Sequence, residues 1–291
     1  MLPQVDAAIA SLRGETDHLR ILTISSTGLY TDRQAGSREA LGRVARETRQ
    51  RSAVTPLITA LEHLSVDAWM TGRWDQAQEL ADECLQLCLT HGYLLQTWTV
   101  RYRQALIAAA RGAYDTADAL TAEMTGWAAP RRIGQAELAA HHVGSVAALG
   151  RGDFEAAYRH AAAISPAGIF ASHVACALWV PLDLVEAAVR TGRREEAAAH
   201  VRAMRAARIK AISPRLALVT AAAAALIAPH DQARARFGEA LAIPGTDQWP
   251  FDLARVRLCY GERLRRARAT TGSRAQLTAA LEIFERLGAR P

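Results

Sequence analysis

The fold is decided by a short pattern that first reads Thr71-Gly72-Arg73-Trp74-Asp75-Gln76-Ala77. It recurs as Arg111-Gly112-Ala113-Tyr114-Asp115-Thr116-Ala117, as Arg151-Gly152-Asp153-Phe154-Glu155-Ala156-Ala157 and as Thr191-Gly192-Arg193-Arg194-Glu195-Glu196-Ala197. The glycines of the four copies are spaced by forty residues each time. A fixed period of this length is typical of proteins built from stacked helical repeats.

Weaker copies extend the period in both directions. A turn is predicted thirty-six residues after the fourth copy by Ala228-Pro229-His230-Asp231-Gln232-Ala233, and another by Thr271-Gly272-Ser273-Arg274. A degenerate first copy is a reasonable reading of Gly36-Ser37-Arg38-Glu39-Ala40. We therefore expect one helical-repeat domain over residues 1–291, with a degenerate first repeat at about 15–55 and clearer repeats from about 56 to 291.

Each position of the pattern has a physical role. Glycine ends a helix where the backbone turns left-handed, so Gly72, Gly112, Gly152 and Gly192 are predicted structural turns. The aromatic residue that follows fills the gap between paired helices, and the acid suits the positive end of the next helix. Alanine, five residues after glycine, permits close approach of a neighbouring backbone. Helices are expected before each turn, as at 94–110 and 137–149, and after it, as at 75–89 and 195–207.

The glycine, aromatic and alanine pattern resembles the tetratricopeptide repeat, although forty residues exceed its usual thirty-four. We therefore predict an all-α, tetratricopeptide-like solenoid of antiparallel helical hairpins. Three C-terminal stretches carry a narrower similarity. They are Trp249-Pro250-Phe251-Asp252-Leu253-Ala254-Arg255-Val256-Arg257-Leu258-Cys259-Tyr260-Gly261-Glu262, Leu264-Arg265-Arg266-Ala267 and Ala279-Ala280-Leu281-Glu282-Ile283-Phe284-Glu285-Arg286-Leu287-Gly288-Ala289-Arg290-Pro291. These stretches resemble the end of the helical sensor region in large ATP-binding LuxR-type (MalT-like) transcription regulators. This resemblance implies a sensor in which a bound effector or partner shifts the balance between resting and active assemblies.

Such regulators also carry an ATPase and a DNA-binding helix-turn-helix, and neither is visible in this sequence. It contains no GxxxxGK[ST] motif, and it ends where the linker to a DNA-binding domain is expected. We expect either an excised sensor domain or a short relative that lost both ends, with no specific nucleic-acid binding by this chain alone. The alternative is a stand-alone adaptor that binds a peptide or protein.

Composition favours a cytoplasmic protein without a membrane span, a metal or a cofactor. The longest nearly apolar run, 216–228, is shorter than the roughly 20 residues that cross a bilayer. The N-terminus reaches Asp6 before any apolar core, unlike a signal peptide. Cys84 and Cys88 share a helix face, but they are better explained as small buried hydrophobes than as metal ligands because no CxxC or histidine pair completes a site.

The formal charge of +6 comes almost entirely from arginine, since Lys210 is the only lysine. Residues 251–291 hold nine arginines against four acids, and Arg263, Arg265, Arg266 and Arg268 make most of this excess. A basic patch can contact nucleic acid. Without interleaved aromatic residues, a solvated helix face or a docking surface for an acidic neighbour is the better interpretation.

The ligand site is predicted by counting back from each turn to the helix that faces the inner surface of the array. This register places Tyr102, His142, Trp179 and Glu186 on that surface, where a small-molecule effector or a peptide would bind. The competing interpretation is that Tyr102 and Trp179 pack between hairpins. Pro181 either kinks a helix over 172–190 or begins one.

An enzyme using His142 and Glu186 as acid and base is a further rival. It is disfavoured because no nucleophile, metal set or cofactor loop accompanies the pair. We expect a binding scaffold and not an enzyme, and the sequence is compatible with a homo-oligomer.

Overall fold

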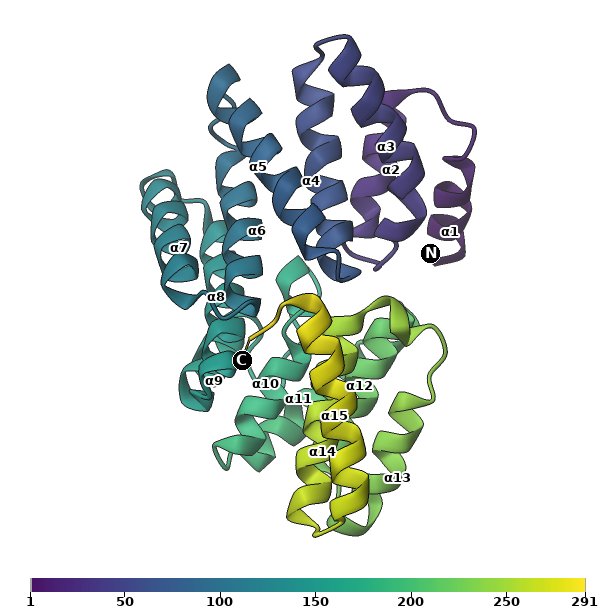
Figure 1. Cartoon of the computed structure of the whole chain (residues 1–291), viewed down its shortest axis with the longest axis vertical. Coiled ribbons are helices and arrows are strands. Elements are labelled where there is room, and N and C mark those ends of the chain that lie inside the picture. The colour runs from purple at the N-terminus through teal and green to yellow at the C-terminus, as the bar shows by residue number, and fades with distance from the viewer. Residues whose placement is uncertain (1, 291) are drawn as a thin grey trace. The chain divides into compact units, whose positions relative to one another are not determined.

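The computed structural model describes residues 2–290, and their regular structure is helical throughout (Figure 1). Fifteen α-helices and four short 3-10 helices follow one another over this range, with no strand among them. The prediction of an all-α protein is confirmed. Within residues 2–290 the chain packs into two compact units: unit 1 comprises the residues up to Ile107 and Asp115–Ala140, and unit 2 comprises Ala108–Tyr114 and the residues from His141 onward.

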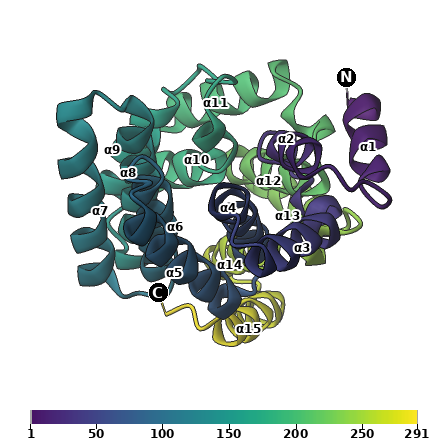
Figure 2. The same ribbon diagram turned by 90° about the horizontal axis from the view of Figure 1, so that it is seen from above.

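Unit 1 is a run of helices in which each packs on its neighbour in the sequence, as α3, α4 and α5 do (Figures 1 and 2). The helices are α1 (Leu2–Ser11), α2 (His18–Gly28), α3 (Gln34–Gln50), α4 (Val54–Met70), α5 (Trp74–His91), most of α6 (Thr97–Ala110) and of α7 (Tyr114–Ala128), η1 (Ala129–Arg131) and the start of α8 (Gly134–Arg151). Leu41, Ile58 and Leu61 are buried in its core, and Cys84 and Cys88 belong to the same cluster.

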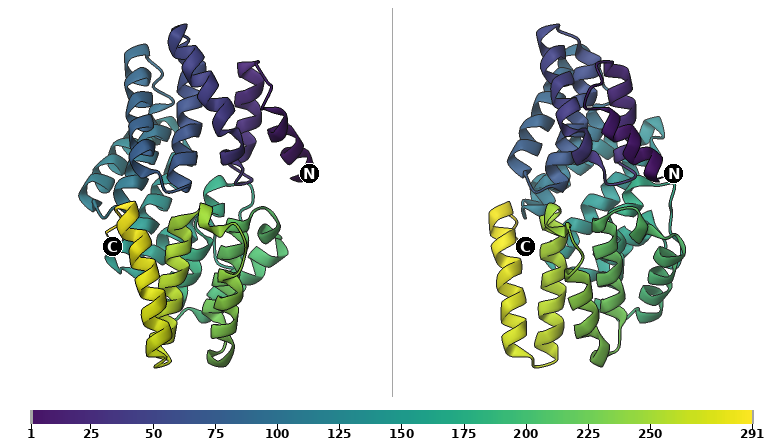
Figure 3. Two further views of the ribbon diagram at one scale, coloured as in Figure 1. Left: turned by 45° about the vertical axis from the view of Figure 1, so that its right-hand side comes forward. Right: turned by 90° about the vertical axis from the view of Figure 1, so that its right-hand side faces the viewer.

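Unit 2 continues the pairing of neighbouring helices. It holds the end of α8, then α9 (Phe154–Ile164), η2 (Ala175–Leu178), α10 (Pro181–Arg190), α11 (Arg194–Ala206), η3 (Ile209–Ala211), α12 (Pro214–Ile227), α13 (His230–Leu241), η4 (Thr246–Gln248), α14 (Pro250–Arg266) and α15 (Thr270–Leu287). The last two helices lie side by side (Figure 3). Small residues, Ala148, Ala157 and Ala187, form one buried cluster and let α8, α9 and α10 approach closely.

The turn glycines have the backbone that the pattern requires. Gly72, Gly112, Gly152 and Gly192 each lie between two helices with φ of 77°, 78°, 74° and 82°. Such left-handed angles are cheap only without a side chain. The alanines five residues later are fully buried at all four copies: Ala77, Ala117, Ala157 and Ala197. Acids stand in the first turn of the following helices, as Asp75 does in α5.

Left-handed residues also stand between these glycines, so that residues 32, 52, 72, 92, 112, 132 and 152 all have positive φ at intervals of twenty. Three of them, Asp32, Ser52 and Arg132, are not glycine. The chain thus reverses at regular steps even where its sequence carries no glycine signal.

Two predicted turns are wrong. Gly36 lies inside α3 and Gly272 lies inside α15, whereas the chain reverses four residues earlier, at Asp32 (φ 54°) and Arg268 (φ 57°). The error has a physical cause. A single non-glycine residue can take the left-handed conformation for about 1–2 kcal/mol, a cost that surrounding packing offsets without any trace in the sequence.

The two proline signals are also resolved. Pro229 stands in a turn between α12 and α13, but that turn has no left-handed residue. Pro181 is the first residue of α10, so the second of the two readings is right and no kinked helix spans 172–190. A proline suits this position because the first amide of a helix has no partner within the helix.

Candidate functional site

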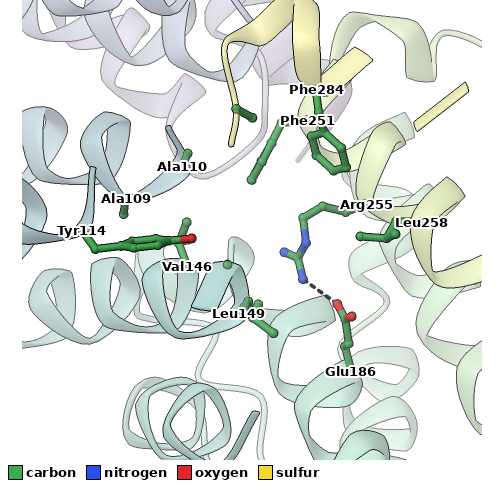
Figure 4. Close-up of a pocket in the computed structure, with 12 residues that line it drawn as sticks. Ala109, Ala110, Tyr114, Val146, Leu149, Glu186, Phe251, Arg255, Leu258 and Phe284 are labelled. Carbon is green, nitrogen blue, oxygen red and sulfur yellow. Dashed lines mark hydrogen bonds and ion pairs between the residues drawn. The ribbon is translucent and has the colours of Figure 1, made fainter. Parts of the chain in front are cut away.

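A cavity of about 80 Å³ lies within unit 2, and six helices and the C-terminal residues line it. Its walls come from the end of α6, the start of α7, the end of α8, and from α10, α14 and α15 (Figure 4). The lining residues are Ala109, Ala110, Tyr114, Val146, Leu149, Gly150, Glu186, Phe251, Arg255, Leu258, Phe284 and Ala289. Only Tyr114, Glu186 and Arg255 in this set carry polar side chains.

Arg255 enters the cavity from α14 and is held by two acids of α10. Its Nη1 donates to Asp183, and its Nη2 donates to Oε2 of Glu186 over 2.9 Å. Asp183 is 1% exposed and also accepts a 2.9 Å hydrogen bond from the Ser145 hydroxyl of α8. The three helices α8, α10 and α14 are therefore joined by buried polar contacts under the cavity.

A second arginine extends this network on the far side of Glu186. Arg190 contacts Oε1 of Glu186 at 3.2 Å and also pairs with Glu262 of α14. Burial by itself lowers the pKa of Arg255, but Asp183 and Glu186 outweigh that effect, so the pKa lies above its ordinary value. Arg255 is charged at any physiological pH, and each oxygen of Glu186 already accepts from an arginine.

Tyr114 faces Arg255 from the opposite wall (Figure 4). The guanidinium of Arg151 lies over the Tyr114 ring, 4.5 Å from its centroid, which holds the ring in place. The hydroxyl lies against Gly150, where even a methyl side chain would overlap it. It is buried and has no hydrogen-bond partner among the described residues. Burial raises the pKa of Tyr114, against the opposing effect of Arg151, so the phenol keeps its proton.

The rest of the lining is apolar. Phe251 and Phe284 meet edge to face, with ring centroids 6.1 Å apart, and Leu258 follows on α14. Val146 and Leu149 contribute from α8. An apolar wall with a few convergent polar groups is the usual make-up of a small-molecule site.

The C-terminal residues close one side of the cavity. Ala289 lines it and is 7% exposed, and the carbonyl oxygen of Arg290 lies directly against Gly112. A side chain at Gly112 would overlap that oxygen. The turn glycine therefore serves a second purpose, because it lets residues 288–290 approach the turn between α6 and α7.

The predicted stripe is only partly assembled at this site. Glu186 lines the cavity, but His142 and Trp179 instead contact each other, with ring centroids 5.7 Å apart. Trp179 is half-buried, directly after η2. Tyr102 belongs to unit 1, is 7% exposed and lies beneath the guanidinium of Arg103. The four residues are thus distributed over different local environments, and the acid of the stripe is occupied by two arginines.

Sequence reasoning missed Tyr114 and Arg255 as site residues. The repeat pattern predicts Tyr114 as the gap-filling aromatic of the second repeat, and nothing in that pattern marks its hydroxyl. Arg255 belongs to the C-terminal stretch that carries the family resemblance, but its acid partners lie 69 and 72 residues earlier. Acidic and basic residues do alternate in both segments, with Glu186 four residues before Arg190 and Arg255 seven residues before Glu262, but only the fold brings the two segments together.

The described residues also bear on metal binding, on membrane spans and on the basic stretch near the C-terminus. No group of three or more His, Cys, Asp or Glu within 2–290 could hold a metal ion. None of the helices described is long and apolar enough to cross a membrane. In the C-terminal basic stretch, Arg263 donates to the carbonyl of Ala228, while Arg265, Arg266 and Arg268 are exposed.

Comparison with known proteins adds no assignment. No protein-family model matches the sequence, and a search of curated proteins finds no match either.

Proposed function

We propose that this chain is a helical-repeat binding scaffold that takes up a small molecule in the cavity of unit 2. One observation carries the proposal: the buried hydroxyl of Tyr114 has no partner among the described residues and lies in a mainly apolar cavity opposite Arg255. Leaving a buried hydroxyl unpaired costs about 1–3 kcal/mol, so such a group is usually retained for a reason.

The architecture that we propose is a tetratricopeptide-like solenoid with a repeat of about forty residues. Support comes from the four turn glycines at forty-residue intervals and from the left-handed residues Gly92 and Arg132, midway between the first three. Fully buried alanines at equivalent positions of four copies support the same register.

The experiment is a small-molecule screen by thermal shift, because any ligand that binds the native state raises its melting temperature. A compound that raises the melting temperature of the wild-type chain should no longer raise that of Ala289→Phe, because the phenylalanine fills the cavity from the C-terminal side. Ala163→Phe, at an exposed position on α9, is the matched control and should keep the response. Two results would argue against the cavity as the binding site. Either no compound of the library raises the melting temperature of the wild-type chain, or the compounds that do so raise that of Ala289→Phe equally.

We extend the proposal to a regulatory role, as the sensor part of a LuxR-type regulator. Its support is the resemblance of residues 249–267 and 279–291 to the end of that family's sensor region. The coding sequence flanking these 291 residues tests it directly. An ATPase upstream and a helix-turn-helix downstream would support the sensor, and an unrelated neighbourhood would leave a scaffold without a transcriptional role.

The second candidate is an adaptor for a peptide or protein partner. Three large apolar side chains around the turn from α5 to α6 favour it: Leu89, Leu94 and Leu95 are 51%, 50% and 59% exposed. Exposed apolar residues that gather in this way are typical of interaction surfaces. A peptide array probed with the wild-type chain and with Leu94→Glu would separate the two candidates, since the substitution leaves the cavity of unit 2 unchanged.

A further inference from the structure

We propose that the ligand of this cavity is uncharged, with a compact apolar body and one oxygen that accepts hydrogen bonds from Tyr114 and Arg255. This inference rests on the proposed function, because it names the chemistry of a ligand at that same site.

The first argument is the balance of donors and acceptors. The Tyr114 hydroxyl keeps its proton and has no acceptor among the described residues. Arg255 uses two N–H groups in its bonds to Asp183 and Glu186, out of the five that a guanidinium offers. The one acceptor side chain of the lining, Glu186, already receives an arginine at each oxygen. The cavity thus presents spare donors, and the missing partner is an acceptor.

The second argument is charge. The buried network beside the cavity contains Arg190 and Arg255, which sum to +2, and Asp183, Glu186 and Glu262, which sum to −3. Its net charge is therefore −1, and the guanidinium of Arg151 over the Tyr114 ring brings the sum to zero. A carboxylate or phosphate would find no excess of positive charge and would have to compete with two acids for Arg255. A cation would meet two donor groups and no spare acceptor, so a neutral oxygen is the group that both arguments leave.

The third argument is size and lining. One water needs roughly 10–15 Å³ on this measure, so 80 Å³ corresponds to a handful of non-hydrogen atoms. An apolar cavity of about 150 Å³ accommodates benzene. The present cavity has about half that volume and is not fully enclosed, so it accommodates part of a five-membered ring or the compact end of a longer molecule. Phe251, Phe284 and Leu258 provide the apolar contact for that body.

The test uses four probes that share a five-membered ring and differ in one group: cyclopentanone, cyclopentene, cyclopentanecarboxylate and cyclopentylammonium. Each is titrated into the full chain while the methyl resonances of Val146, Leu149 and Leu258 are followed by NMR, which localises binding to the cavity. We expect cyclopentanone to bind about threefold to tenfold more tightly than cyclopentene, the range given by one net hydrogen bond. The two charged probes should bind more weakly than cyclopentene.

Two variants test the role of the hydroxyl. Tyr114→Phe removes it, and Gly150→Ala displaces it without removing it. Both should reduce the preference for cyclopentanone over cyclopentene, leaving only the part that Arg255 supplies, and Tyr114→Phe should leave cyclopentene binding unchanged. The same spectra report whether each variant is folded.

The outcomes separate the inference from the proposed function. Tighter binding of the carboxylate or the ammonium probe, or an unchanged cyclopentanone preference in Tyr114→Phe, would refute the ligand chemistry and leave the cavity as a binding site. If no probe shifts the three methyl resonances at any attainable concentration, the cavity is not a small-molecule site, and both proposals fail together.

Discussion

The contact between the C-terminal residues and the turn at Gly112 leads to a prediction that one matched pair of variants can test. Gly112 and Gly152 occupy equivalent turns and have nearly the same φ, 78° and 74°. A side chain at Gly152 would meet nothing within 4 Å, whereas one at Gly112 would overlap the carbonyl oxygen of Arg290. Alanine at either position therefore has the same backbone cost, but only one of them must also move a neighbouring segment.

The magnitudes follow from these two contributions. Forcing an alanine into the left-handed region costs about 1–2 kcal/mol, and this should be the whole effect of Gly152→Ala. Gly112→Ala must in addition displace residues 288–290, which exposes the Ala289 methyl group and costs about 1 kcal/mol more. For a unit of this size, that extra cost corresponds to a further drop of roughly 2–4 °C in melting temperature.

Thermal denaturation followed by circular dichroism measures both variants, in the full chain and in a chain that ends at Leu287. In the shortened chain the extra cost at Gly112 should vanish, because the overlapping carbonyl is gone. Equal melting temperatures for the two variants in the full chain would refute the docking of the C-terminal residues on this turn. A difference that persists after shortening would refute it as well.

Three further predictions concern the core of the site and the pH response. Gly150→Ala gains at most about 1 kcal/mol of helix propensity, but its methyl group overlaps the Tyr114 hydroxyl, so as a single substitution it should lower the melting temperature. In Tyr114→Phe the nearest ring carbon is 3.2 Å away, and the same substitution should be tolerated. Additive effects in a double-mutant cycle would count against the overlap. Asp183→Ala should lower the free energy of unfolding by about 3–5 kcal/mol, because it leaves the buried Arg255 short of a partner. Glu83→Ala breaks a surface pair and should lower it by about 1 kcal/mol or less. Similar losses in the two variants would contradict the buried network. Burial lowers the pKa of His63 to about 4, from an unfolded value near 6.5, so between these values the unfolded state binds the proton more tightly than the folded state. The free energy of unfolding should therefore fall by up to about 3 kcal/mol as pH drops from 6.5 to 4. In His63→Gln that share of the pH dependence should be absent, and an unchanged profile would show that this histidine does not cause it.

The helices themselves could be predicted because the repeat carries local signals with direct physical meaning. The expected helix over 94–110 is observed as Thr97–Ala110, and that over 195–207 as Arg194–Ala206. Glycine at the turn, an acid in the next first turn and a buried alanine each follow from backbone geometry, so their positions could be read from the pattern. Turns without glycine could not, because Asp32 and Arg268 pay their backbone cost through contacts that lie outside the local sequence.

The site was less predictable because it depends on contacts between distant segments. The count that identified Glu186 assumed that each inner helix repeats the same register, and Glu186 does line the cavity. In the last repeat the predicted turn glycine, Gly272, lies four residues after the real turn at Arg268, so a register counted from it does not align α14 with the earlier helices. Tyr114 shows a different limit. Its aromatic ring fits the repeat, but whether its hydroxyl is paired depends on what the fold places around it.

The ion pairs between α10 and α14 also have a consequence for the order in which the protein is made. Asp183 leaves the ribosome 72 residues ahead of Arg255, and at about 5–20 residues per second that interval lasts roughly 4–14 s. During this time α10 can pair with α9 and α11, its neighbours in the sequence, since helix hairpins form far faster than synthesis proceeds. The acids of α10 therefore lack their Arg255 partner until α14 emerges, and α14 docks on helices that are already paired. Closure of the cavity is thus among the last events in the synthesis of unit 2, because it also waits for Phe284 and Ala289.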